Sequence, residues 1–219
     1  MARTRYPQLC ALARAAEVIG ERWTLLIVRE LLLGPRRFTD LRERLDGVSA
    51  SVLAERLLRL EETGVIARRF LEPPAASMVY ELTATGRALE PAMHELLRWG
   101  ARFMLPARPK DRVEAEWLRL ALTACARRSS TPNRSFLLRL RRGRGEMSLR
   151  VAGGTGGTVV TEGAGPADAT VIAEPRTVLA LMSGAMAPRA ALRDGAVRVE
   201  GDISALDEFP ALFDVSVTA

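Results

Sequence analysis

The sequence predicts an α+β protein with two domains: a winged helix-turn-helix over residues 1–105 and a second, mixed α+β domain over residues 113–219. Three observations lead to this prediction. Two short amphipathic segments lie within residues 34–66, and two strand-like segments follow them directly. After a proline- and charge-rich stretch at residues 106–112, which we interpret as a linker, the pattern changes to short strands separated by glycine turns.

The first domain begins with an apolar helix and then two amphipathic ones. Residues 23–33 are apolar on nearly every side, as expected for a central buried helix. Phe38, Leu41 and Leu45 form the apolar stripe of the next helix. The stripe of the helix after it consists of Val52, Leu53, Leu57 and Leu60. Two such helices joined by a tight turn form a helix-turn-helix, whose second helix enters a DNA groove in proteins that use this motif.

A β-hairpin is expected immediately after this pair of helices. Residues 65–72 and 78–82 are rich in β-branched and aromatic side chains. Pro73 and Pro74 separate them, and proline cannot donate a hydrogen bond to a β-ladder. The helix-turn-helix and its hairpin together constitute a winged helix.

The helical wheel selects candidate base-reading residues. We expect Ser49 to cap the second helix, with the four apolar residues turned inward. The opposite face then carries Ser51, Ala54, Glu55 and Arg59, with Ala50 at the exposed N-terminal end. Because the N-terminal half of such a helix reaches base edges, Ser51 and Glu55 are the candidates for sequence readout.

Arginines around the motif are candidates for phosphate contacts. Arg37 precedes the first helix of the motif, and Arg68 and Arg69 flank the wing. Arg56 lies at the edge of the buried stripe. It could bind phosphate or, equally, form an ion pair with Glu43 or Glu30.

Composition agrees with a cytoplasmic protein. The 219 residues carry a net charge of +6, with Lys110 as the single lysine. This charge is compatible with DNA binding, but the cations are spread over both halves, and a bias towards arginine also follows from genomic base composition. We find neither an apolar run long enough to span a membrane nor a signal peptide, and two cysteines do not form a disulfide framework.

We expect no catalytic or metal site and no cofactor. The single histidine, His94, lies on a helix expected over residues 83–104. It has no histidine, cysteine or acidic cluster at ligand spacing, and no nucleophile–base set can be assembled around it. The sequence therefore does not predict an enzyme.

The second domain is expected to combine one sheet with several helices. Strands are predicted at residues 135–141, 146–152, 158–162, 169–173 and 197–200. Helices are predicted at residues 113–127, 175–185, 188–192 and 204–213. Turns are expected at Gly143 and Gly145 and at the GGTGG run of residues 153–157, which lies between strands and therefore indicates a hairpin turn and not a phosphate loop.

Motifs in the first half resemble the HxlR family of bacterial winged-helix transcriptional regulators. They are WTLLIVRELLLGPRRFTDLR, GVSASVLAERLLRLEETGVI, VYELTATGRAL and a closing WG, in that family's order. The resemblance implies a homodimeric, sequence-specific DNA-binding protein whose first and last domain helices form the dimer interface. It also makes Cys10 a candidate sensor of oxidants or electrophiles, assisted by Arg5 and Arg14. The alternative is a small residue packed in that interface.

The string ADATVIAEPRTVLALMSGAMAPRAALRDGAVRVEGD resembles the sterol carrier protein 2 family. That resemblance implies a five-stranded sheet with covering helices around an apolar tunnel. The candidate lining residues are Leu179, Met182, Met186, Leu206, Phe209, Leu212 and Phe213. The alternative is a filled domain without a ligand. The two resemblances together imply a regulator controlled by an apolar effector, and the alternative function is a lipid carrier or interaction protein that docks a protein partner through its winged helix.

Overall fold

The computed structural model describes residues 5–74, 76–104, 108, 111–142 and 145–215. It divides the chain into two compact units, Met1–Met93 and His94–Ala219. Most of the predicted linker at residues 106–112, and the turn predicted at Gly143, lie outside the described residues.

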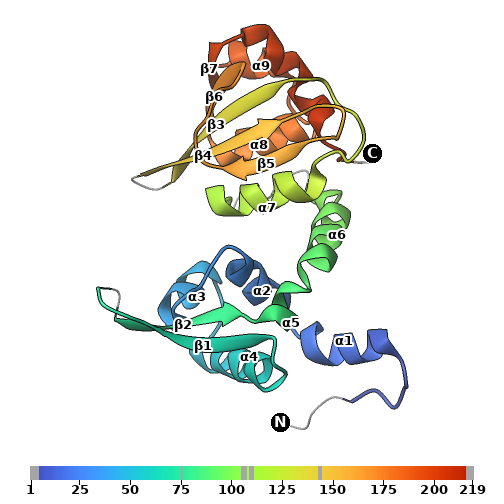
Figure 1. The fold of residues 1–219 in the computed structure, drawn as a ribbon, viewed down its shortest axis with the longest axis vertical. Helices are drawn as coiled ribbons and strands as arrows, with labels where there is room; N and C mark the ends of the chain where they lie inside the picture. Colours follow the sequence, from blue (N-terminus) through green and yellow to red (C-terminus); the bar gives the residue numbers. More distant parts are fainter. Residues whose placement is uncertain (1–4, 75, 105–107, 109–110, 143–144, 216–219) are drawn as a thin grey trace. The chain divides into compact units, whose positions relative to one another are not determined.

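The N-terminal unit is a winged helix-turn-helix (Figure 1). Its helices are α1 (Ala11–Ile19), α2 (Thr24–Leu32), α3 (Phe38–Arg44) and α4 (Ala50–Glu62), and its wing is formed by β1 (Ile66–Leu71) and β2 (Ser77–Leu82). Gly64 ends α4 with a positive φ of 69°, and the next amide, that of Val65, donates to the carbonyl of Leu60 at 2.9 Å. This sharp reversal starts β1 directly after the helix.

The predicted hairpin is confirmed. Its strands are antiparallel, with Ile66 opposite Leu82 and Leu71 opposite Ser77. Arg36 forms an isolated antiparallel β-bridge with Tyr80, through two backbone hydrogen bonds of 3.0 and 2.8 Å. The wing is thereby joined to the residues that lead into α3.

The core of this unit contains the predicted stripes of all three central helices. Its buried members are Ile27, Val28, Leu31, Leu41, Leu45, Val48, Leu53, Leu57, Leu60, Val65, Ile66, Leu82 and Met93. Phe38 and Val52 pack against it while remaining partly exposed. Burial of these aliphatic side chains, each of which contributes about 1.5–3 kcal/mol, is the main force that holds the helices and hairpin together.

One helix was expected over residues 83–104, and this expectation was wrong. The segment forms two helices, α5 (Ala84–Arg87) and α6 (Glu90–Ala101). The break has a local cause in Pro91, which has no amide hydrogen for the carbonyl of Arg87 and whose ring would collide with it in a continuous helix. Pro91 instead occupies the first turn of α6, where no such hydrogen bond is needed.

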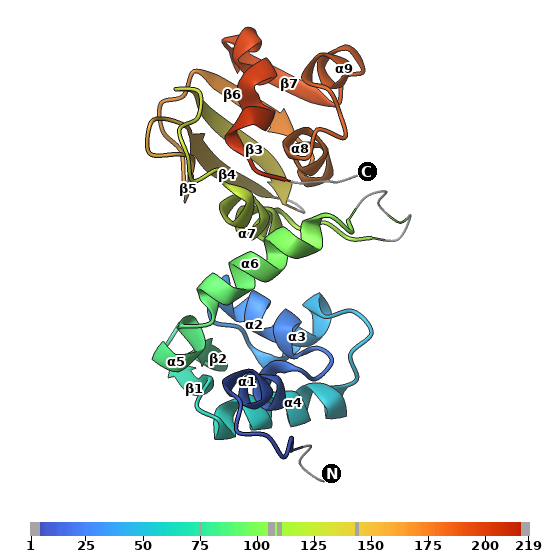
Figure 2. The same ribbon diagram turned by 90° about the vertical axis from the view of Figure 1, so that its right-hand side faces the viewer.

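The C-terminal unit is a five-stranded sheet with helices on one face (Figure 2). The strands are β3 (Ser135–Arg142), β4 (Gly145–Ala152), β5 (Val159–Glu162), β6 (Ala169–Ala173) and β7 (Val197–Gly201), in the order β5-β4-β3-β6-β7. Only the β3–β6 pairing is parallel among these neighbours. The five predicted strands are confirmed, as is the connection of antiparallel β4 and β5 through the GGTGG run.

The covering helices are α7 (Ala115–Cys125), α8 (Pro175–Met182), α9 (Pro188–Arg193) and a 3-10 helix (Ile203–Leu212). Alternate residues of β3, namely Phe136, Leu138 and Leu140, are fully buried against them. Phe209 lies between Phe136 and Phe213, with ring centroids 5.2 Å from each. The last helix is of the 3-10 type and contains Pro210, which an α-helix interior would not accommodate.

Candidate nucleic-acid interface and ligand cavity

Helix α4 is capped and oriented as the sequence predicts. The Ser49 side-chain oxygen accepts a hydrogen bond from the Val52 amide at 3.3 Å. Leu53, Leu57 and Leu60 are buried on the inner side. The outer side is therefore fixed by packing. Its exposed residues are Ala50, Ser51, Ala54, Leu58 and Glu62.

Two arginines of α4 are engaged inside the unit. Arg56 contacts Glu21 at 2.5 Å, and Arg59 contacts the other carboxylate oxygen of the same residue at 2.9 Å. Glu21 lies between α1 and α2. The sequence suggested Glu43 or Glu30 as the ion-pair partner of Arg56, and the structure corrects this to Glu21. Arg59 was expected on the open face and instead leans towards Glu21, with its side chain 25% exposed.

Glu55 lies beside the open face of α4. Its side chain is 38% exposed and contacts Arg56 at 3.3 Å. The carboxylate of Glu55 and the hydroxyl of Ser51 are the polar side-chain groups at the N-terminal half of this surface. Ser51 is exposed, and its hydroxyl lies 3.1 Å from that of Ser49.

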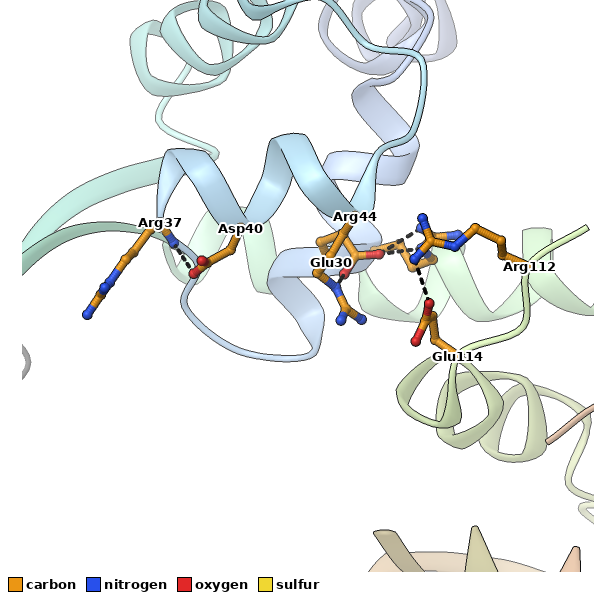
Figure 3. A network of polar contacts seen from close by, with 7 residues as sticks. Glu30, Arg37, Asp40, Arg44, Arg112 and Glu114 are labelled. Atoms are coloured by element: carbon orange, nitrogen blue, oxygen red, sulfur yellow. Dashed lines mark hydrogen bonds and ion pairs between the residues drawn. The ribbon is translucent and has the colours of Figure 1, made fainter. Parts of the chain in front are cut away.

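A buried carboxylate joins α2 to α3. Glu30 is fully buried, yet Arg29 reaches one of its oxygens at 2.7 Å. Arg44 of α3 reaches the other at 2.5 Å (Figure 3). A charge removed from water is tolerated only when it is paired and hydrogen-bonded. This cluster therefore sets the position of α3, and with it the turn that leads into α4.

Arg37 lies at the start of α3, where its side chain is exposed. Its backbone amide donates to the Asp40 carboxylate at 3.0 Å, and Figure 3 shows the Arg37 side chain extending away from that contact. A carboxylate in the first turn of a helix is favourable because it faces unpaired amides. The geometry holds the backbone of Arg37 firmly while its guanidinium faces outward.

The arginines of the wing also have internal partners. Arg68 contacts Glu61 of α4 at 2.9 Å and lies over the Tyr80 ring at 5.7 Å. Arg69 contacts Glu81 across the hairpin at 2.9 Å. Both side chains are about half exposed, so these are surface ion pairs of small net energy that a competing phosphate could displace.

Three exposed apolar side chains in this unit escaped the sequence reasoning. Leu58 of α4 is 49% exposed, and Phe70 and Met78 of the wing are 56% and 50% exposed. Phe70 and Met78 are directly opposite each other in the hairpin register. The periodicity of α4 could have identified Leu58, because it falls one turn after Ala54 and outside the buried stripe.

The electrostatics of the unit are nearly balanced. Residues 1–93 contain 14 arginines and 12 acidic residues, so their net charge is +2, whereas that of the whole chain is +6. Charge alone therefore does not mark this unit as a nucleic-acid binder.

Cys10 occupies the residue before α1 and is exposed. Arg14, expected to assist its ionisation, pairs with Glu17 at 2.8 Å. A hydrogen bond from the Tyr6 amide, reinforced by Arg14, lowers the pKa of Glu17. The other cysteine, Cys125, is buried, and burial raises the pKa of its thiol.

Large apolar side chains are exposed on α1 and α6. Leu12 of α1 is 77% exposed, and Leu96 and Trp99 of α6 are 43% and 58% exposed. Phe103, just after α6, is 66% exposed and packs edge-to-face on Trp99 at 5.0 Å between ring centroids. His94 lies half-buried on α6, and the described residues contain no cluster of three metal-ligating side chains.

The C-terminal unit contains a cavity of about 500 Å³. Its walls are mostly apolar, with polar groups from Asp111, Arg112, Arg176 and Thr177. The apolar lining residues are Met104, Val113, Leu179, Ala180 and Met186. Two predicted lining residues, Leu179 and Met186, are therefore found there.

The other predicted lining residues lie elsewhere. Met182 borders a much smaller space of about 20 Å³ together with Leu179. Leu206, Phe209, Leu212 and Phe213 belong to the packed core and line neither space. Helical spacing alone does not distinguish a side chain that fills a core from one that borders a cavity.

Two family models match successive parts of the chain. Residues 18–108 match the HxlR-like helix-turn-helix family, and residues 115–214 match the SCP-2 sterol transfer family. No helix among the described residues is both long and apolar enough to cross a membrane.

Individual relatives match the first half. An HTH-type transcriptional regulator of Bacillus subtilis, YvaP, is 35% identical over 94 residues, which are 43% of this chain and 87% of YvaP. YodB of the same organism, an HTH-type transcriptional regulator, is 35% identical over 92 residues, or 42% of this chain and 82% of YodB. The solved structure of reduced YodB shares 32% identity, covers 46% of this chain and all of its own, and has a TM-score of 0.40. The chain therefore belongs to the HxlR-like helix-turn-helix family of transcriptional regulators and carries an SCP-2-type domain behind its winged helix.

Proposed function

We propose that this regulator binds DNA sequence-specifically as a homodimer, with α4 in the major groove, and that an apolar ligand in its C-terminal unit modulates binding. The carrying observation is the outer face of α4. This face is exposed, its helix is capped by Ser49, and its orientation is set by the buried stripe and by Glu21. A rigid helix with an open N-terminal half is what base readout requires.

Contacts to the DNA backbone are assigned to Arg37, Arg68 and Arg69. These side chains are exposed or half-exposed at the start of α3 and on the wing. We assign a supporting role to Arg56 and Arg59, because their contacts with Glu21 hold α4 in place. Phosphate contacts fix the register on the duplex but do not read its sequence.

Homodimer formation is supported by the exposed apolar side chains of α1 and α6. Trp99 and Phe103 are large, adjacent and more than half exposed, and such groups are typical of interface centres. A two-fold dimer would present two copies of α4, so the preferred DNA should contain inverted half-sites about one helical turn apart.

The cavity of the C-terminal unit supports ligand binding. Its volume of about 500 Å³ lies within the range of small-molecule sites, and its apolar walls suit a lipid-like molecule. Arg112 and Arg176 would face a polar end of that molecule. Such a ligand changes DNA affinity only if it binds the DNA-competent and DNA-incompetent states with different affinity.

Selection of bound fragments from random DNA tests the principal proposal. We expect enrichment of inverted repeats, and binding to them should weaken with rising salt. In mobility-shift titrations, the double substitution Ser51→Ala and Glu55→Ala should change which repeat is preferred, whereas Arg37→Ala should weaken binding to all sequences alike. Failure to enrich any sequence would refute the proposal, and an equal loss on every sequence from the double substitution would refute the readout assignment.

A separate experiment tests whether the C-terminal unit binds a ligand. Organic-solvent extraction of the purified full-length protein, followed by mass spectrometry, should yield a lipid-like molecule. Met186→Trp, which fills the cavity, should abolish its recovery, whereas Met78→Trp on the wing should not. Equal recovery from both variants would contradict the cavity assignment.

A further inference from the structure

We propose that α4 reads thymine methyl groups, with Ala54 and Leu58 as specificity-determining residues. This inference rests on the proposed function and names the chemistry that its recognition helix selects. It predicts that the preferred half-site contains thymines whose 5-methyl groups, and not only their hydrogen-bonding edges, contribute to affinity.

The open face of α4 carries a short apolar strip, which begins with the hydroxyl of Ser51 and ends one turn before the exposed Glu62. Ser51, Ala54 and Leu58 follow one another at i, i+3 and i+7, so they lie along one side of the helix. All three are exposed, and Leu58 is 49% exposed although its neighbour Leu57 is buried. At a rise of about 1.5 Å per residue, the strip is about 10 Å long, which matches about three base-pair steps.

The same helix offers no cation for guanine. Arginine and lysine are the side chains that most often read guanine, through two hydrogen bonds to its major-groove edge. Helix α4 contains no lysine, and both of its arginines, Arg56 and Arg59, contact the carboxylate of Glu21. Reaching a base would require each of them to leave this partner.

Apolar side chains discriminate between bases in one way. In the major groove, thymine alone presents a methyl group, and alanine or other apolar side chains contact it. An exposed leucine is ordinary on protein surfaces. Leu58, however, lies on the same exposed side of α4 as Ala54, which a DNA groove would cover. Its side chain would then be removed from water and placed against either a thymine methyl group or a polar base edge. Only contact with the methyl group makes this desolvation favourable.

The expected size of the effect follows from the area of one methyl group. Burial of one such group changes affinity about fourfold. Two methyl groups contacted in each half-site of a dimer would together change affinity by more than a hundredfold. This is part of the preference of about 10³–10⁷-fold by which specific binding typically exceeds non-specific binding.

The test uses the full-length protein and a fragment that selection has enriched. Each thymine of the half-site is replaced in turn by deoxyuridine, which lacks only the methyl group. We expect a loss of about fourfold at one or two adjacent positions. In the Leu58→Ala variant, replacement of the thymine that faces this residue by deoxyuridine should no longer change the affinity. Glu62→Ala, an exposed change on the same helix, should leave the wild-type pattern unchanged.

The outcomes separate this inference from the function on which it rests. Enriched fragments that bind selectively but tolerate deoxyuridine everywhere would overturn the methyl readout and leave the regulator function intact. The same holds if Leu58→Ala weakens binding equally with and without the methyl group. An absence of any selective binding would overturn both proposals. Circular dichroism melting of Leu58→Ala and Glu62→Ala verifies that each variant remains folded.

Discussion

Removal of the Glu30 carboxylate should destabilise the winged helix more than any single surface change. Glu30 is fully buried, and its two oxygens contact Arg29 at 2.7 Å and Arg44 at 2.5 Å. Glu30→Ala deletes the carboxylate and leaves the guanidinium groups of Arg29 and Arg44 beside an unfilled space. Breaking a buried ion pair from one side costs about 3–5 kcal/mol. Because the arginine side chains are 17% and 19% exposed and recover some hydration, we expect a loss near the lower end, about 3 kcal/mol.

Urea unfolding monitored by tryptophan fluorescence measures this change, since Trp23 packs against the N-terminal core. The matched control is Glu81→Ala, which breaks the surface pair between Glu81 and Arg69 and should cost at most about 1 kcal/mol. Glu30→Gln, which keeps the shape but removes the charge, should fall between the two.

A loss below about 1 kcal/mol for Glu30→Ala would refute the reasoning, because it would mean that the two arginines do not depend on this carboxylate. A second consequence concerns DNA. Since Arg44 belongs to α3, loosening the cluster should weaken binding to every sequence alike and leave the order of preference unchanged.

Three other predictions each concern a single residue. Ser49→Ala removes the α4 cap and should lower stability by about 1 kcal/mol, measured by thermal unfolding; an unchanged midpoint would contradict the capping role. The Ser135 amide and hydroxyl donate to Asp168 at 2.7 and 2.9 Å and lower its pKa, so its stabilising effect is present above the unfolded pKa of about 3.9 and is lost as pH falls through the lower folded value. Asp168→Asn should therefore unfold more easily at pH 7 and show a weaker dependence on acid, and identical acid titrations of the two proteins would disprove the linkage. Cys10 is exposed and Cys125 is buried, so a quinone should alkylate Cys10 first and weaken DNA binding in mobility shifts; Cys10→Ser should resist, and equal sensitivity would exclude a sensor role.

The elements were largely predictable because their signals are local. The periodicity of Leu53, Leu57 and Leu60 defined the inward side of α4, and the alternation in β3 and β4 defined the sheet. Pro91 was also a local signal, and its effect within an otherwise helical pattern was missed. The 3-10 helix around Pro210 has the same explanation.

The partners of charged residues were not predictable in the same way. Arg56 and Glu21 are 35 positions apart in the chain, and only the packing of α4 beside the segment between α1 and α2 brings them together. Periodicity specifies which way a side chain points along its own helix but not which loop it meets. The cavity has the same limitation, since Leu179 borders it and Phe209 fills the core although both are apolar residues of helices.

The internal pairs also determine how the interface can work. An arginine that contacts a carboxylate and is mostly shielded from water gains little from a phosphate, because one charge-assisted contact is exchanged for another. The half-exposed pairs of Arg68 and Arg69 are weaker and more easily displaced. Arg56 and Arg59 are therefore better suited to holding α4 rigid than to binding DNA themselves. With a net charge of only +2 over residues 1–93, non-specific attraction to the duplex is weak. Discrimination between sequences must then come from Ser51, Ala54, Glu55 and Leu58 on the outer side of α4, where contacts depend on the base and not on the backbone.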